Sequence, residues 1–283
     1  MSTETMHDST DPLSFMPGRI SIVGAGKVGE AIIEAVLKAG FYPLENIRIT
    51  TRTEKRARQL YGLFGVEAIT NEEAAETSDL ILLCVKPQKA QEVLSEMAPK
   101  LRADCAIISI MAGITIAQME RWAQVACPVI RSMPNTPLRI RKGMTALAGG
   151  THAGAQHLSF AKAMFDIMGR TVILDETLFD AVTGLSASGP AFIYIMIEAL
   201  AEGGVKAGLP RNAAIELAAQ ACLGASSMVL EDGRHPAVLK DEVTTPAGCT
   251  IDGILKLEEG GIRVTLIKAV EEAARKARAL GEE

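Results

Sequence analysis

The hydrophobic residues in the first part of the chain form short unbroken runs, separated by stretches in which they recur at helical spacing. Runs such as 79–85 (DLILLCV) and 106–110 (AIISI) are typical of parallel strands buried on both faces. Alternating strands and helices predict an α/β fold with a doubly wound parallel sheet. The expected strands are 20–23, 46–50, 79–85, 106–110 and 129–133, with 144–148 and 171–174 closing the sheet around a helix over 152–168.

The pattern changes after residue 175. From Leu178 onward there are no strand signals, only helical stretches rich in Ala, Leu and Ile. The segment that opens at Pro190 is apolar nearly all round as far as Glu198, so it requires burial in a core or a subunit interface. The string 185–191 (LSASGPA) is expected to break a helix, which restarts at Pro190. We predict a disordered tail (1–17), a dinucleotide-binding domain (18–175) and an all-α dimerisation and substrate domain (176–283).

Three glycines follow the first strand and precede the first helix. Gly24, Gly26 and Gly29 have the spacing G-x-G-x-x-G, and the helix that follows stops at Gly40. A strand that turns tightly into a helix exposes free N–H groups at the positive end of the helix, and glycines let a pyrophosphate approach them. The glycine triplet alone indicates only a turn, but in this context it predicts dinucleotide binding.

The end of the second strand bears on the choice of cofactor. A site for NAD usually has an acidic residue there, about 20 residues after the glycines. This chain has Thr50, Thr51 and Arg52 instead, and these side chains suit a 2′-phosphate. NADP(H) is therefore the preferred cofactor and NAD(H) a possible one; alternatively, Arg52 only begins a solvated helix over 53–62. Lys86 follows the strand at 79–85, where it contacts the ligand or simply starts a helix.

Composition excludes several other functions. The chain has 283 residues, a net charge of −5 and only 4% aromatic residues, which argues against nucleic-acid binding. No apolar run is expected to reach membrane-spanning length, and the N-terminus is expected to lack a secretion signal. The five cysteines show no pairing pattern, so reduced thiols in the cytoplasm fit best. The histidines have no metal-binding spacing, and His152, His157 and His235 are expected at the surface, so we expect no metal site.

Candidate chemistry in the second half lies in 241–250 (DEVTTPAGCT). A loop that leads into a helix offers free N–H groups for a substrate carboxylate. Reduction of a carbonyl needs a proton donor such as His or Lys, which this string lacks, whereas a protonated imine carries its own proton. Hydride transfer to a C=N bond is therefore favoured. A hydroxyacid dehydrogenase that uses Lys206 and a non-catalytic NADPH sensor remain alternatives.

The chain resembles the pyrroline-5-carboxylate reductase family, which reduces a cyclic imine to proline with NAD(P)H. The resemblance covers roughly residues 20–280, and its most specific parts are the proline-rich corner VIRSMPNTP and the DEVTTPAGCT string. The other matching strings are VGAGKVG, CVKPQ, SIMAGIT, GLSASGPA, ALAEGGVKAGLP and the continuation TIDGILKLEEGG. The resemblance implies a Rossmann domain followed by a helical dimerisation domain, and an oxidoreductase acting on CH–NH in the last step of proline biosynthesis. It also implies a homodimer, with decamers of five dimers as a larger assembly.

The resemblance also implies roles for individual residues. Cofactor contacts are implied for Gly24, Ala25, Gly26, Lys27, Val28, Gly29, Thr51, Arg52, Asn71, Val85, Lys86, Pro87 and Ala112. Substrate contacts are implied for Glu176, Thr245, Gly248, Cys249 and Thr250, with the Thr250 hydroxyl facing the ring nitrogen as the catalytic group. The family usually reads TSPGGTT where this chain has Thr245, Ala247 and Cys249. The change at Ala247 removes a glycine's freedom from the loop, and substrate range is the property that these departures affect.

Overall fold

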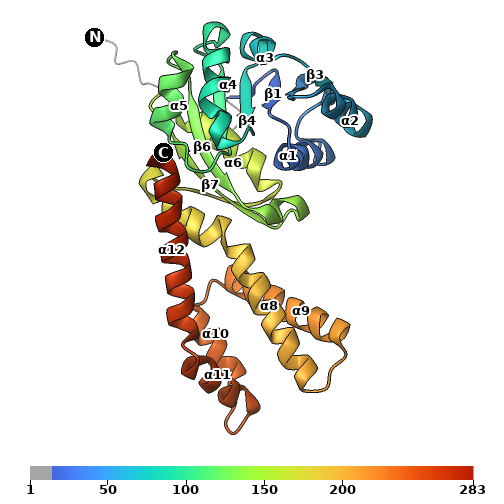
Figure 1. The fold of residues 1–283 in the computed structure, drawn as a ribbon, viewed down its shortest axis with the longest axis vertical. Helices are drawn as coiled ribbons and strands as arrows, with labels where there is room; N and C mark the ends of the chain where they lie inside the picture. The colour runs from blue at the N-terminus through green and yellow to red at the C-terminus, as the bar shows by residue number, and fades with distance from the viewer. Residues whose placement is uncertain (1–14, 283) are drawn as a thin grey trace, which may run out of the picture. The chain divides into compact units, whose positions relative to one another are not determined.

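The computed structural model describes residues 15–282 (Figure 1), and a single sheet forms the core of the first part. The strands are β1 (Ile20–Val23), β2 (Ile47–Thr50), β3 (Glu67–Ala68), β4 (Leu80–Leu83), β5 (Ala106–Ser109), β6 (Val129–Pro134), β7 (Gly143–Gly149) and β8 (Gly169–Ile173). Their order is β3-β2-β1-β4-β5-β6-β7-β8. Strands β1 to β6 are parallel, β7 is antiparallel to β6, and β8 is parallel to β7. The predicted doubly wound sheet is confirmed.

Helices cover both faces of this sheet (Figure 1). They are α1 (Lys27–Lys38), α2 (Glu54–Phe64), α3 (Asn71–Thr77), α4 (Ala90–Met97), α5 (Ile116–Ala123) and α6 (Ala155–Asp166). Leu80 and Leu82 of β4 belong to an apolar cluster with residues of α1, α2 and α6, whereas Ile81 and Leu83 pack with α3, α4 and α5. Both faces of the strand are buried, which explains why the sequence there is apolar without a break.

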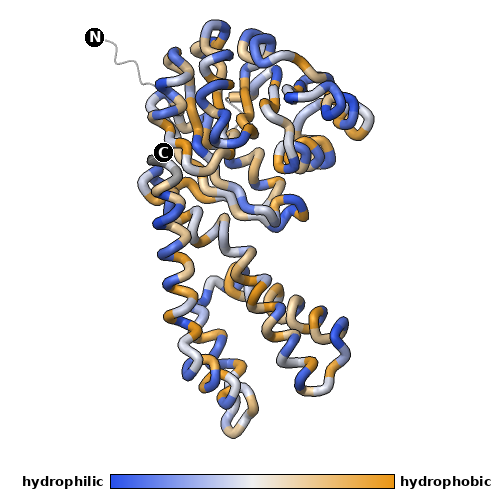
Figure 2. The backbone as a smooth tube through the Cα atoms, viewed as in Figure 1, coloured by the Kyte–Doolittle hydropathy of each residue, from blue (hydrophilic) through white to orange (hydrophobic). Residues whose placement is uncertain are grey.

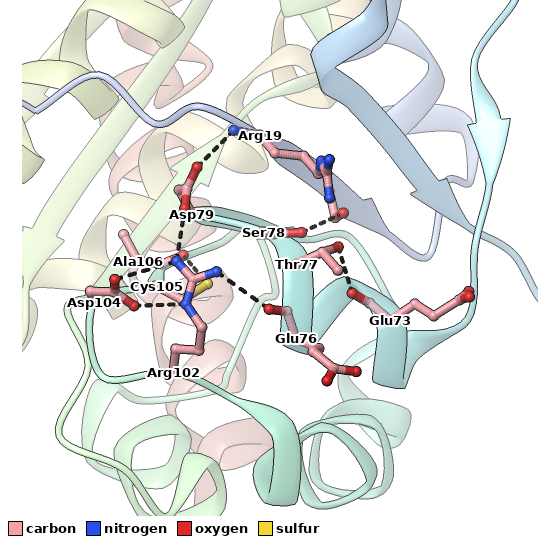
Figure 3. A network of polar contacts seen from close by, with 11 residues as sticks. Arg19, Glu73, Glu76, Thr77, Ser78, Asp79, Arg102, Asp104, Cys105 and Ala106 are labelled. Carbon is pink, nitrogen blue, oxygen red and sulfur yellow. Dashed lines mark hydrogen bonds and ion pairs between the residues drawn. The ribbon is translucent and has the colours of Figure 1, made fainter.

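A polar network ties together the N-terminal ends of the central strands (Figure 3). Asp79, just before β4, accepts hydrogen bonds from the Arg19 backbone N–H at 2.9 Å and from Arg102 Nη2 at 2.8 Å. Arg102 also donates to Asp104 at 2.9 Å and to the carbonyl of Glu76 at 3.3 Å. Burial opposes ionisation of Asp79, but the hydrogen bonds from Arg102 and the backbone outweigh it and lower its pKa. These side chains therefore stabilise the fold. They lie at the N-terminal ends of the strands, opposite the carboxyl ends where the ligand site is expected.

Part of the segment expected to be a disordered tail packs against α6. Residues 1–14 of the expected tail (1–17) lie outside the described residues, but Phe15 packs edge-on against His157, with ring centroids 4.5 Å apart, and against Phe160. His157 is half-buried rather than at the surface, and its Nδ1 accepts from the Gly154 N–H at 2.9 Å. Burial lowers the pKa of His157. The expectation of a surface position for His157 is therefore wrong, because its ring both packs and caps α6.

The remainder of the chain is helical, as predicted. Its elements are η6 (Glu176–Leu178), α7 (Phe179–Val182), the π-helical η7 (Thr183–Ala187), α8 (Gly189–Lys206), α9 (Arg211–Asp232), α10 (Pro236–Val243), α11 (Cys249–Glu259) and α12 (Ile262–Glu282). Two compact units are present: residues up to 187 together with those from 274 onward, and 188–273. The first unit thus runs beyond the expected boundary near Asp175. It does so because Phe179 is fully buried in the apolar cluster beneath α3, α4 and α5.

The string 185–191 lies where one helical element ends and the next begins, close to the predicted restart: η7 ends at Ala187, and α8 begins at Gly189 with Pro190 in its first turn. Ser188 stays in the right-handed helical region, with φ −83° and ψ −26°. Pro190 has no N–H to donate to the carbonyl of Ser186, but Asn135 Nδ2 donates to that carbonyl at 3.2 Å. Asn135 thus satisfies a carbonyl that Pro190 leaves without a helical donor, at the junction between η7 and α8.

Helices α8 and α9 are rich in hydrophobic residues (Figure 2), and many of these side chains are exposed. The exposed fraction is 64% for Ile195 and 58% for Leu217. Within the described residues, the spans Glu176–Lys206 and Arg211–Asp232 are long and apolar enough to cross a membrane by length and composition. The expectation that no apolar run reaches that length is therefore wrong. The apolar surface needs a cover that residues 15–282 do not supply.

Candidate functional site

The three glycines of the loop between β1 and α1 have three different tasks. Gly24 has φ +80°, and an added Cβ would overlap the Val85 side chain. A Cβ on Gly26 would lie 3.9 Å from the Gly24 carbonyl oxygen, an ordinary contact distance, whereas a Cβ on Gly29 would lie 3.4 Å from Ile22 and 3.5 Å from Cys84. The first glycine makes the turn, the second leaves room for a ligand, and the third lets the helix pack closely on the sheet.

The same loop presents unpaired N–H groups. The carbonyl of Thr50 accepts from the N–H groups of Gly24 and Ala25 at 3.1 Å each, which fixes the loop to the end of β2. Gly26 is the N-cap of α1 and makes no side-chain capping bond. Among the described residues, the backbone N–H groups of residues 27–29 have no hydrogen-bond acceptor. They lie at the positive end of α1, where a phosphate group binds favourably.

The corner after β2 is open to solvent. Thr51 Oγ1 donates to the carbonyl of Thr53 at 3.1 Å, and Thr53 caps α2. The Arg52 side chain is exposed, and no described residue pairs with it. The corner therefore holds a free guanidinium next to the glycine loop, as a 2′-phosphate site requires.

The other predicted cofactor residues lie at the same edge of the sheet. Because β1, β2, β4, β5 and β6 are parallel, the chain after each strand emerges at one edge, and the strand order reverses between β1 and β4. Val85, Lys86 and Pro87 follow β4, with Lys86 exposed, and Ala112 is exposed after β5. Asn71 begins α3, and its Nδ2 donates to Glu96 at 2.9 Å, so its amide is already used within the chain.

The proline-rich corner follows β6. Pro134 is the last residue of the strand and is paired with Thr145, and 136–140 forms the short 3-10 helix η5 (Thr136–Ile140). The prolines thus occupy a strand end and a 3-10 turn. Asn135 Oδ1 accepts from the Met144 N–H at 2.9 Å while its Nδ2 bonds to Ser186. Asn135 therefore fixes the corner to β7 and to η7.

Glu176 makes two contacts within the sheet unit. Its Oε1 accepts from the backbone N–H of Ile116, in the first turn of α5, at 2.7 Å and from Arg131 Nη1 at 3.0 Å. Arg131 is 4% exposed and its guanidinium lies over the ring of Phe179, 4.8 Å from the centroid. One carboxylate oxygen of Glu176 therefore has a structural task, and a substrate contact stays a prediction for the other.

The predicted substrate residues form the turn before α11. Gly248 is the N-cap of this helix and its N–H donates to the carbonyl of Thr245 at 3.0 Å. A Cβ on Gly248 would lie 2.5 Å from Thr245 Oγ1. Cys249 and Thr250 lie in the first helical turn rather than ahead of it, because the helix begins at Cys249 and not at Ile251. The Thr250 side chain is half-buried, and no described residue is hydrogen-bonded to its hydroxyl.

Ala247 adopts a conformation that suits glycine. Its φ is +56°, in the left-handed region, where a non-glycine residue costs roughly 1–2 kcal/mol. The departure noted in the sequence therefore falls at a position that needs positive φ. The backbone adopts the turn nonetheless, at the expense of local strain.

Other candidate groups contribute little. Lys206 is exposed at the end of α8. Cys105 and Cys127 are buried, and burial raises the pKa of the Cys127 thiol to about 11, so it is a poor nucleophile. Among residues 15–282, no three His, Cys, Asp or Glu side chains are grouped to hold a metal ion.

Sequence reasoning missed two residues, Arg56 and Asn135. The guanidinium of Arg56 donates to the carbonyl of Ala25 at 3.1 Å and so contacts the glycine loop. The available signal was a cation in the first turn of α2, where the helix dipole disfavours it. Asn135 is part of the proline-rich corner, but its bond to Ser186 joins segments far apart in the sequence.

A glycine loop with free N–H groups at the switch point of a doubly wound sheet, joined to a helical unit, defines a dinucleotide-dependent oxidoreductase. Residues 19–113 match the family described as "NADP oxidoreductase coenzyme F420-dependent". Residues 176–280 match the family described as pyrroline-5-carboxylate reductase dimerisation, which supports a homo-oligomer.

Comparison with individual proteins identifies the family. The chain is 40% identical over 265 residues to the pyrroline-5-carboxylate reductase of Arabidopsis thaliana, covering 93% of this chain and 96% of the relative. It is 39% identical over 266 residues to that of Corynebacterium melassecola, covering 93% and 98%. The chain belongs to the pyrroline-5-carboxylate reductase family, and the prediction of an oxidoreductase of this family is confirmed.

Solved structures agree with this assignment. A pyrroline-5-carboxylate reductase from Coxiella burnetii superposes with a TM-score of 0.87 at 30% identity, covering 93% of this chain and 98% of that one. The Plasmodium falciparum pyrroline carboxylate reductase with NADP bound gives a TM-score of 0.82 at 28% identity, with the same coverage. The predicted combination of a Rossmann sheet and a helical dimerisation domain is thus confirmed.

Proposed function

We propose that the protein reduces 1-pyrroline-5-carboxylate to L-proline by hydride transfer from NADPH. The family membership supports the reaction, and the single observation that carries the cofactor half is the glycine loop, with unpaired N–H groups from residues 27–29 at the start of α1. The bound cofactor supplies the hydride. The chain's own residues bind, orient and stabilise the two reactants.

Arg52 is the proposed basis of the preference for NADP(H) over NAD(H). Its guanidinium is free of ion pairs among the described residues, and positions 50–52 at the end of β2 carry no acidic side chain that would repel a phosphate. NAD(H) lacks the 2′-phosphate and loses only this contact, so it stays a usable but weaker cofactor. A relative from Plasmodium falciparum has NADP bound, which fits this choice.

Thr250 is the proposed catalytic residue. The half-buried Thr250 hydroxyl is available to accept a hydrogen bond from the protonated ring nitrogen. Backbone N–H groups at the start of α11, next to the Gly248 N-cap, are available for the substrate carboxylate. Hydride adds to the imine carbon, the C=N π-electrons move to nitrogen, and the nitrogen keeps its proton. No separate proton donor is therefore needed, which fits a loop without His or Lys.

The proposed partner for the exposed apolar face is a second copy of the chain. The face is carried by α8 and α9, within the segment that matches the dimerisation family, so a homodimer is favoured over insertion into a membrane. Decamers of five such dimers are the proposed larger assembly. The negative charge and few aromatic residues argue against nucleic-acid binding, and the free cysteines fit a cytoplasmic enzyme.

NADPH absorbance at constant enzyme tests the reaction. Addition of 1-pyrroline-5-carboxylate should cause oxidation of NADPH and formation of proline, whereas a panel of 2- and 3-ketoacids should not. Turnover of a ketoacid that depends on Lys206 would instead identify a hydroxyacid dehydrogenase. Binding of NADPH without turnover of any compound would identify a sensor.

A further inference from the structure

Helix α2 has an arginine where its own capping favours an acid. Thr53 is the N-cap, so Arg56 is the third helical residue, the position at which Glu or Gln completes a capping box. A cation in the first turn also opposes the positive end of the helix dipole. A residue that breaks a local rule in this way indicates a task elsewhere in the fold.

The Arg56 guanidinium bridges α2, the glycine loop and α1. Nε donates to the carbonyl of Ala25 at 3.1 Å, and Nη2 donates to the carbonyl of Gly26 at 3.3 Å. Nη2 also pairs with Glu30 at 2.5 Å, and Nη1 donates to Gln59 at 2.9 Å. All three nitrogens are used, and the side chain is only 23% exposed.

These bonds fix the direction of the loop's peptide groups. In a trans peptide, the carbonyl of one residue points opposite to the N–H of the next. Holding the Gly26 carbonyl toward α2 therefore directs the Lys27 N–H away from α2. The Lys27 N–H is one of the three N–H groups at the start of α1 that have no acceptor among the described residues. Arg56 thus fixes the orientation of this N–H group before the ligand binds, and the N–H can then donate a hydrogen bond to a pyrophosphate.

The ion pair with Glu30 has a second effect. Glu30 lies in the first turn of α1, close to the same N–H groups. An unpaired carboxylate there would repel a pyrophosphate, and the Arg56 charge cancels it. Because that charge is already matched by Glu30, Arg56 acts through the loop rather than by attracting the phosphate directly.

We propose that Arg56 is a positioning residue that preorganises the pyrophosphate loop and neutralises Glu30, and so strengthens binding of NADPH and NADH alike. The proposal deepens the proposed function, since it rests on dinucleotide binding at this loop. It separates Arg56 from Arg52, which faces solvent and would act only on a 2′-phosphate.

Calorimetric titration of each purified variant with NADPH and with NADH tests this proposal. Arg56→Ala should weaken both cofactors by a similar factor, on the order of tenfold, because two carbonyls lose their donor and a carboxylate is left unpaired. In turnover assays KM for NADPH should rise by that factor, while kcat at saturating NADPH changes by less than about twofold. Arg58→Ala, which removes an exposed arginine paired with Glu54, is the matched control and should leave both affinities unchanged.

Two further variants divide the effect. Arg56→Lys keeps a charge for Glu30 but cannot span both carbonyls, so its loss should be intermediate. If thermal melting shows that Arg56→Ala does not fold, Arg56→Lys takes its place in the test. Combining Arg56→Ala with Glu30→Gln should recover only part of the lost affinity, because the loop stays unanchored.

Three results would overturn the proposal. Unchanged affinity for both cofactors would show that the contacts do not matter for binding, and a loss confined to NADPH would mean direct contact with the 2′-phosphate. Full recovery of cofactor affinity in the double variant would mean that Arg56 acts only by neutralising Glu30 and does not position the loop. Because calorimetry measures binding without turnover, failure to reduce 1-pyrroline-5-carboxylate would count against the proposed function and not against Arg56.

Discussion

The loops before α1 and α11 end in the same way but are held differently. Each leads into a helix through a glycine N-cap without a side-chain cap, Gly26 in one and Gly248 in the other. The first loop is fixed from outside by the carbonyl of Thr50 and by the guanidinium of Arg56. The second is held by its own short turn, through the bond from Gly248 to Thr245, and residues 245–247 are exposed.

This difference separates the two halves of the site. The glycine loop lies within one compact unit and obtains its order from that unit, so cofactor binding needs only a single folded chain. The loop before α11 belongs to the unit whose apolar helices are uncovered, and the bond that closes it, from Gly248 to Thr245, is local. We therefore expect changes in assembly to impair substrate binding while they leave cofactor binding intact.

The largest effect is expected from Ile195→Glu. Ile195 is 64% exposed on α8, and burial of an unpaired carboxylate in a subunit interface costs roughly 3–5 kcal/mol. The dimer should dissociate at micromolar concentration and lose at least about a hundredfold in activity, while NADPH still binds. Sedimentation velocity and calorimetry measure the two quantities.

Ile140→Glu is the matched control, since Ile140 is 73% exposed but lies in the sheet unit. It should leave both the assembly and the activity unchanged. A wild-type protein that sediments as a monomer at micromolar concentration would contradict the expectation that substrate binding depends on assembly.

Thr250→Val comes next. Valine keeps the shape of threonine but removes the hydroxyl, and loss of a hydrogen bond to a charged group costs roughly 1.5–3 kcal/mol. We expect kcat/KM for 1-pyrroline-5-carboxylate to fall by about one to two decades, with NADPH affinity unchanged. Thr250→Ser, which keeps the hydroxyl, should retain most of the activity. Wild-type kcat/KM in the valine variant would show that the substrate is misplaced.

Arg52→Ala sharpens the comparison within the cofactor half. Because Arg52 is exposed, solvent screens its contact with a phosphate, and we expect a loss of about tenfold in NADPH affinity, the lower end for a charge-assisted bond. NADH affinity should hardly change. Equal losses for both cofactors would assign Arg52 a general structural role, which is the pattern expected of Arg56 instead.

The parts of this molecule that sequence predicts are those set by local pattern. Leu80 to Leu83 alternate between two apolar clusters, so an unbroken apolar run fixed a strand buried on both faces. The glycine spacing predicted the loop at its end, because G-x-G-x-x-G between a strand and a helix is a local signature. The side chains that a Cβ on Gly24 or Gly29 would meet, Val85 and Cys84, lie far along the chain.

The missed features depend on partners far along the chain. Asn135 donates to the Ser186 carbonyl the hydrogen bond that Pro190 cannot give, from 51 positions away. Arg56 contacts Ala25 across 31 positions. A hydrophobic repeat in the sequence does not indicate a contact between residues so far apart. The roles of Asn135 and Arg56 are therefore seen only in the folded structure.

The smallest effect is expected from Ala247→Gly, which tests how loosely the second loop is held. Glycine should relieve a left-handed strain of roughly 1–2 kcal/mol, less about 0.5–1 kcal/mol for its greater freedom in the unfolded chain. The net gain is therefore up to about 1 kcal/mol, seen as a higher urea midpoint and slower amide exchange at 244–251. Ala247→Val should move both in the opposite direction, because a branched side chain tolerates φ +56° least. Cofactor affinity should stay constant in both variants, since the glycine loop lies in the other unit. Destabilisation by glycine would mean that the strain at Ala247 is compensated, and that this loop is held more firmly than its contacts indicate.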